Sequence, residues 1–187
     1  NAMSEVCEAT GADVIRLAEA LGLDERIGSK FLKPGLGFGG GCLPKDIRSF
    51  KHRAEELGIG EAVSFLGEVD AINVRRRLRT VALIRQVAGG DLTGVKVAAL
   101  GAAFKPDSDD VRDAPALDVA RMLYLEGAIV SVYDPEASVN AHRVYPDLEY
   151  ASSLDQALAG AEVTVLLTEW QEFRTADPVQ MGEQVRT

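Results

Sequence analysis

The residues with the clearest chemical potential are Cys42 and Asp46, which follow a glycine-rich run between Pro34 and Cys42. Such a run forms a poor helix or strand, because glycine loses the most backbone freedom on ordering. It can, however, bend sharply and bring backbone N–H groups close to a ligand. Pro44 is typical of a first helical turn, where the helix dipole favours a cysteine thiolate. Asp46, one turn further on, can face the same side as Cys42.

These residue types favour covalent catalysis by the Cys42 thiol, with Asp46 as a nearby proton carrier. A connector loop with an inert cysteine is the alternative, since free cysteines are often buried. A generic thiol redox protein is disfavoured because Cys7 lies far from Cys42 in the sequence. Cys7 stands among apolar residues and is expected to be packed. The two histidines are far apart, and no metal site is expected.

The 187-residue chain has the composition of a globular protein, with 47% apolar and 26% charged residues. Its formal charge of -9 argues against nucleic acid and anionic membranes as partners. The arginines at 75–77 and 79 are therefore read as a solvated helix face. No apolar run is long enough to span a bilayer and no signal-peptide pattern is present, so a cytoplasmic location is expected.

The first half of the chain predicts helices that would hold the glycine loop. Residues 3–10 and 13–21 read as short helices, with Gly11 as the break and Asp13 as an N-cap. A third helix is expected over 44–57, ended by Gly58. The apolar periodicity of residues 61–87 predicts one long amphipathic helix, a spine between two domains or a dimer seam.

The second half predicts alternating strands and helices. Short apolar strands are expected at 95–100, 129–133 and 163–167, with helices at 115–126 and 154–158. The expected fold class is α/β: a helical central domain with a long spine helix, then a Rossmann-like doubly wound parallel sheet. The predicted domains are 1–88, carrying the cysteine loop, and 89–187, which is expected to be incomplete at its C-terminal end.

The first predicted strand is not followed by a dinucleotide fingerprint. Where Gly-x-Gly-x-x-Gly would stand, the chain has Gly101-Ala-Ala-Phe-Lys-Pro106. A dinucleotide would be poorly held there. A nucleoside diphosphate at the carboxyl end of the strand fits better, with Lys105 as a point charge for phosphate.

The segment from Gly39 to Asp46, Gly-Gly-Gly-Cys-Leu-Pro-Lys-Asp, resembles the active-site motif of the UDP-glucose/GDP-mannose 6-dehydrogenase family. The usual family form is Gly-Gly-Ser-Cys-(Phe/Leu)-Pro-Lys-Asp, so Gly41 replaces the common serine. The resemblance covers essentially the whole chain, through the segments 11–14, 26–28, 70–73, 101–105, 110–112 and 133–135.

This resemblance implies an NAD-dependent oxidoreductase of nucleotide-sugar metabolism and polysaccharide biosynthesis. UDP-glucose would be oxidised twice to UDP-glucuronate through a Cys42 thiohemiacetal and thioester, with Asp46 assisting proton transfer. Lys45 and Arg112 would contact the cofactor NAD. The implied substrate-binding residues are Arg26, which would reach a neighbouring subunit's nucleotide-sugar, and Phe31, Leu32, Lys33, Pro34, Gly35, Gly39, Phe104 and Lys105.

The resemblance also implies a homodimer through residues 61–87 and an N-terminal NAD-binding domain that is absent from this sequence. The chain alone is therefore expected not to transfer hydride. Two alternatives remain open: a GDP-mannose 6-dehydrogenase, and a non-catalytic module that binds nucleotide-sugars.

Overall fold

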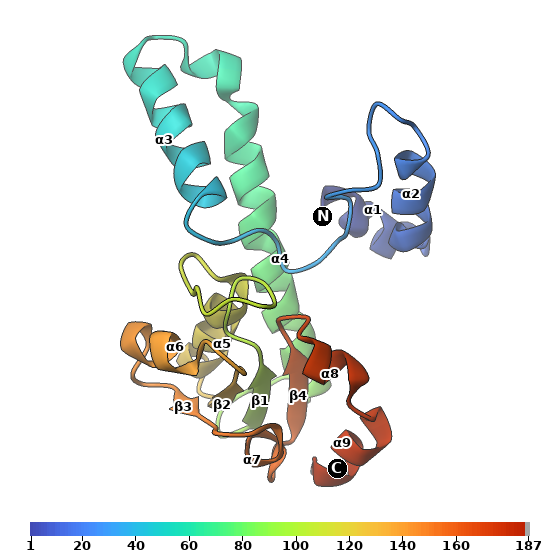
Figure 1. Cartoon of the computed structure of the whole chain (residues 1–187), viewed down its shortest axis with the longest axis vertical. Helices are drawn as coiled ribbons and strands as arrows, with labels where there is room; N and C mark the ends of the chain where they lie inside the picture. Colours follow the sequence, from blue (N-terminus) through green and yellow to red (C-terminus); the bar gives the residue numbers. More distant parts are fainter. Residues whose placement is uncertain (186–187) are drawn as a thin grey trace.

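Helix α4, Phe65–Val87, runs from the helical half of the molecule into its α/β half (Figure 1). The structure, a computed structural model, describes residues 1–185. The helical half also contains α1 (Ala2–Thr10), α2 (Val14–Gly22), α3 (Leu43–Glu56) and a 3-10 helix (Gly60–Val63). Helix α3 lies along the first part of α4, and the glycine loop crosses from α2 to α3 beside α4 (Figure 1).

The helix ends follow the predicted local chemistry. Asp13 accepts hydrogen bonds from the backbone N–H groups of Ile15 and Arg16, and thereby caps α2. Gly11 ends α1 with a φ of 72°, a left-handed conformation that glycine adopts without steric cost. The predicted 61–87 helix is present, but its start differs. Residues 60–63 form a 3-10 turn in the tight connection from α3, and the regular α-helix begins at Phe65.

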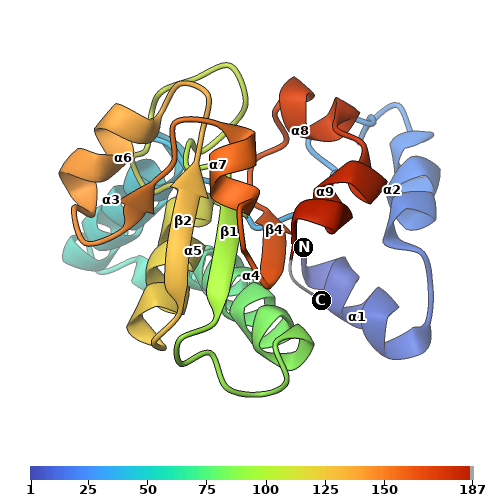
Figure 2. The same cartoon turned by 90° about the horizontal axis from the view of Figure 1, so that it is seen from below.

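The α/β half confirms the predicted parallel sheet. Its strands are β1 (Lys96–Leu100), β2 (Ile129–Tyr133), β3 (Glu149–Tyr150) and β4 (Val163–Leu166), in the order β3-β2-β1-β4. All three pairings are parallel; Ala98 of β1, for example, lies between Ser131 and Thr164. Helices α4 and α5 (Pro115–Leu125) cover one face, and α7 (Leu154–Leu158) covers the other (Figure 2).

Four elements of this half were not predicted: β3, α6 (Ser138–Val144), α8 (Gln171–Thr175) and α9 (Pro178–Gln184). All four have seven residues or fewer, too few for a periodic apolar pattern to show. The core that they complete is continuous around β1, whose residues 97–100 are buried beside β2, β4 and α7. Within residues 1–185, no helix is both long and apolar enough to cross a membrane.

The carboxylate of Asp134, which follows β2, organises the end of the sheet. It is only 2% exposed and accepts hydrogen bonds from five N–H groups. Two come from the turn after β1, Ala102 N at 2.7 Å and Ala103 N at 3.0 Å. The others are the Trp170 indole at 3.1 Å and the backbone N–H groups of residues 136 and 137. Asp134 therefore joins the chain segments that follow β1, β2 and β4.

We expect Asp134→Asn to destabilise the protein by about 2–4 kcal/mol, because an amide group leaves buried N–H donors without an acceptor. For a chain of this size, the melting temperature should fall by roughly 5–10 °C in a thermal scan. Asp147→Asn is the matched control, since Asp147 is half exposed and its ion pair in the described part of the chain is with Arg121. Equal melting temperatures for the two variants would contradict the organising role of Asp134.

Candidate functional site

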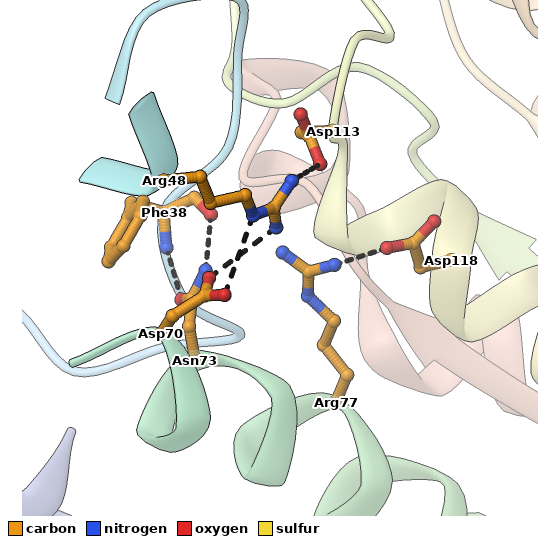
Figure 3. A network of polar contacts seen from close by, with 7 residues as sticks. All are labelled: Phe38, Arg48, Asp70, Asn73, Arg77, Asp113 and Asp118. Atoms are coloured by element: carbon orange, nitrogen blue, oxygen red, sulfur yellow. Dashed lines mark hydrogen bonds and ion pairs between the residues drawn. The ribbon is translucent and has the colours of Figure 1, made fainter. Parts of the chain in front are cut away.

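Asn73 of α4 holds the middle of the glycine loop. Its side-chain amide accepts from Phe38 N and donates to Phe38 O, both at 2.8 Å (Figure 3). Asn73 is 2% exposed, and a Cβ on Gly37 would lie 1.8 Å from its Oδ1. Gly37 has a φ of 114°, so any other residue there would be strained as well as obstructed.

The end of the loop packs directly against the α/β half. A Cβ on Gly39 would lie 2.4 Å from the backbone oxygen of Asp113, and one on Gly40 would lie 2.8 Å from the Phe104 ring. A Cβ on Gly41 would lie 2.3 Å from the guanidinium carbon of Arg112. Gly40 N also donates to the backbone oxygen of Arg112 at 2.9 Å. The absence of side chains therefore lets the 104–113 segment lie against the residues that precede Cys42.

Cys42 is exposed and stands immediately before α3, with proline in the first turn, as the sequence predicts. Lys45 and Asp46 form an ion pair at 3.1 Å, and each side chain is about two-thirds exposed. Cys7 is buried in the helical half. The protein therefore has one accessible and one inaccessible thiol. No group of three or more metal-ligating side chains occurs in the part of the chain that the structure describes.

A cavity of about 880 Å³ lies beside the glycine loop, a volume typical of small-molecule sites. Its walls come from α2, residues 29–38, residues 103–106 and the segment after β4. Most of the predicted substrate-binding residues line it: Phe31, Leu32, Lys33, Pro34, Gly35, Phe104 and Lys105. Cys42 and Asp46 do not line the cavity, although the neighbouring Leu43 does.

Four other predicted site residues also lie outside the cavity walls: Arg26, Gly39, Lys45 and Arg112. Arg26 is turned to solvent and forms an ion pair with Asp24 at 2.6 Å. Gly39 faces Asp113 instead. Phe31 does line the cavity but is 99% exposed, with a φ of 61° that is unusual for an aromatic residue.

Arg48 and Arg77 form ion pairs between the helical half and the α/β half that the sequence analysis did not predict (Figure 3). Arg48 of α3 donates to Asp113 at 3.1 Å and to both carboxylate oxygens of Asp70 at 3.4 Å. These hydrogen bonds, chiefly those to Asp70, raise the pKa of Arg48. Arg77 of α4 pairs with Asp118 of α5. Burial raises the pKa of Asp118, and the Arg77 charge opposes that rise.

The end of β1 does not fit a dinucleotide. Gly101 has a φ of 111°, and a Cβ there would lie 2.5 Å from Thr168, so the chain itself fills the position beside the glycine. The carboxylate after β2, which binds ribose in dinucleotide folds, here binds Ala102 N and Ala103 N. Lys105 extends nearby with its ammonium group 5.5 Å from the centre of the Phe104 ring.

Solved structures with this arrangement include dehydrogenases of nucleotide sugars. A UDP-glucose dehydrogenase from Pyrobaculum islandicum covers 95% of this chain with a TM-score of 0.84 and 35% identity; the match takes in 43% of that chain. An NDP-N-acetyl-D-galactosaminuronic acid dehydrogenase from Methanosarcina mazei covers 97% with a TM-score of 0.78 and 26% identity, over 39% of its own chain.

Family models match both halves. Residues 1–75 match the central domain of the UDP-glucose/GDP-mannose dehydrogenase family, and residues 98–187 match its UDP binding domain. The chain belongs to this family. A UDP-glucose 6-dehydrogenase from Rhizobium meliloti is 39% identical over all of this chain, and TuaD from Bacillus subtilis is 38% identical over 97% of it. The chain spans 42% and 39% of these relatives' lengths. The domain division predicted at residue 88 lies between the two matched ranges and stays a prediction.

Two glycines of the loop provide a direct test of the packing against the α/β half. Gly39 has no room for a methyl group, whereas a Cβ on Gly35 would meet nothing within 4 Å; neither has a positive φ. We expect Gly39→Ala to destabilise the protein by about 1–3 kcal/mol through overpacking. Gly35→Ala should leave the stability unchanged or raise it slightly. Denaturant unfolding measures both, and a tolerated Gly39→Ala would show that the two halves do not meet at this glycine.

Proposed function

We propose that the protein containing this chain is an NAD-dependent UDP-glucose 6-dehydrogenase, which oxidises UDP-glucose to UDP-glucuronate. The observation that carries the proposal is the exposed Cys42, held at the end of a glycine loop that lies between a nucleotide-sized cavity and the UDP binding half. The two curated relatives with this name match 100% and 97% of this chain.

The nucleotide part of the substrate would bind in the cavity beside the glycine loop. Lys105 provides a positive charge at the carboxyl end of β1, in the wall of the cavity. Residues 31–35 form the facing wall, where Lys33 supplies a second positive charge that can bind a diphosphate. We propose that the sugar extends from here towards Cys42, and that Arg26 contacts the nucleotide-sugar of a second subunit.

Cys42 would act on the aldehyde formed by the first oxidation. Its thiolate attacks the carbonyl carbon to form a C–S bond, and the carbonyl oxygen takes up a proton, giving a thiohemiacetal. NAD supplies a hydride acceptor for both oxidations when bound. After the second oxidation, water attacks the thioester, the C–S bond breaks and the thiolate is regenerated. Asp46, one turn along α3, accepts a proton from the attacking water.

The cofactor would be held mainly by residues outside this chain, because the end of β1 does not fit a dinucleotide. Lys45 and Arg112 are both exposed cations near Cys42. Lys45 follows Cys42 by three residues, and the Arg112 guanidinium lies against Gly41. We propose that both contact the cofactor. We further propose a cytoplasmic homodimer formed along α4, whose Val74 and Leu78 expose apolar surface.

Lys105→Ala should weaken UDP binding about tenfold or more, because a charge-assisted hydrogen bond to phosphate contributes roughly 1.5–3 kcal/mol. UDP-glucose should lose affinity by a similar factor. Calorimetric titration measures both, and titration with GDP and GDP-mannose tests the base preference.

Lys96→Ala is the control for this loss, since Lys96 lies at the opposite end of β1 and is also exposed. Tight GDP binding would favour the GDP-mannose alternative. Unchanged UDP affinity in Lys105→Ala would place the nucleotide elsewhere.

In the full-length protein, Cys42→Ala should abolish release of UDP-glucuronate, because no other exposed thiol exists in residues 1–185 to trap the aldehyde. Chromatographic separation of the nucleotide sugars measures the product. Cys7→Ala, which removes the buried thiol, should retain turnover. An acid product formed at near the original rate by Cys42→Ala would exclude the covalent mechanism.

A further inference from the structure

Arg48 connects the helix that begins after Cys42 to the α/β half. It lies on α3, six residues after the cysteine, and its guanidinium group reaches Asp113 in the loop before α5 (Figure 3). A second carboxylate, Asp70 of α4, holds the same guanidinium from the other side at 3.4 Å. Arg48 is therefore fixed by its own half of the molecule, and Asp113 is the group that it can hold in place.

Asp113 has a backbone conformation that few residues with a Cβ adopt. Its φ of 45° lies in the left-handed region, which aspartate enters more readily than most residues. Two contacts act on this turn besides Arg48. Gly39 lies against the backbone oxygen of Asp113, and Gly40 N donates to the backbone oxygen of Arg112. The turn thus depends on contacts from the glycine loop and from α3.

The consequence of this turn is the position of the Arg112 side chain. Its guanidinium lies where a Gly41 side chain would be, on the residue before Cys42, and donates to both carboxylate oxygens of Asp110. The hydrogen bond and charge of Asp110 raise the pKa of Arg112, and a charge on Cys42 contributes least. The remaining charged groups near this junction form pairs of their own, Lys45 with Asp46 and Arg48 with Asp70 and Asp113.

We propose that Arg48 is a positioning residue: by holding Asp113 it keeps the Arg112 guanidinium over Gly41, where its charge stabilises the Cys42 thiolate. The inference rests on the proposed role of Cys42 as the nucleophile. The side chain of Arg48 itself carries out no step. Its effect passes through Asp113 to Arg112, and it depends on position 41 having no side chain.

Alkylation of Cys42 by iodoacetamide tests the proposal, because it reports the thiolate directly and requires neither substrate nor cofactor. At neutral pH and low salt, Arg112→Gln should slow alkylation about threefold, the size of an exposed charge pair. Arg48→Met should slow it to a similar degree. In the Arg112→Gln background, Arg48→Met should have no further effect. Raising the salt concentration should slow the unsubstituted protein towards the rate of Arg112→Gln.

Arg53→Met is the matched control, since Arg53 lies on the same helix and, among the residues that the structure describes, forms its ion pair with Glu56 at 2.7 Å. Its alkylation rate should match that of the unsubstituted protein. Asp113→Asn breaks the same ion pair from the other side and should reproduce the Arg48→Met result if that variant folds poorly. An unchanged rate in Arg48→Met, or an equal slowing with and without Arg112, would overturn the proposal. A Cys42 thiol that is inert in every variant would instead refute the proposed nucleophile.

Discussion

The close approach of the glycine loop to the 104–113 segment is the constraint on which the site depends. At Gly39, Gly40 and Gly41, the space that a Cβ would need is occupied by atoms of Asp113, Phe104 and Arg112 respectively. At Gly39 this approach requires glycine, because a methyl group would have to push the backbone of Asp113 away; at Gly41 the guanidinium end of Arg112 is the group that would have to move. The same three contacts fix the entrance of α3, and therefore Cys42, relative to a cavity whose walls include Phe104 and Lys105.

Polar side chains of helix α4 also bind both segments, the glycine loop on one side and α5 on the other. Asn73 satisfies both backbone groups of Phe38, and Arg77 reaches Asp118 of α5 (Figure 3). Two other nitrogens of Arg77 are buried without a hydrogen-bond partner among the residues described. Such a buried arginine adds little net stability, since its desolvation cost offsets the ion pair. Its orientation is nevertheless specific, because within residues 1–185 its ion pair is with Asp118 of α5.

The elements and the cysteine junction could be predicted because their signals are local. The strands 129–133 and 96–100 are short apolar runs, and Cys42, Pro44 and Asp46 are adjacent in sequence. The pairs Arg48–Asp113 and Arg77–Asp118 could not be predicted, because partners 41 to 65 residues apart leave no periodic pattern. The cavity likewise combines segments near residues 31, 104 and 168, and only the folded chain brings them together.

The hydrogen bonds of Asp134 explain why the end of this Rossmann-like sheet does not fit a dinucleotide. In a dinucleotide fold, the carboxylate after the second strand is free to bind ribose. Here it is saturated by the turn after β1 and by Trp170, and Thr168 blocks the side of Gly101. These contacts direct the 102–106 segment outward, so that Phe104 packs on Gly40 and Lys105 faces the cavity. The bonds that fill the dinucleotide position are thus the same bonds that place Lys105 in the wall of the cavity beside the cysteine loop.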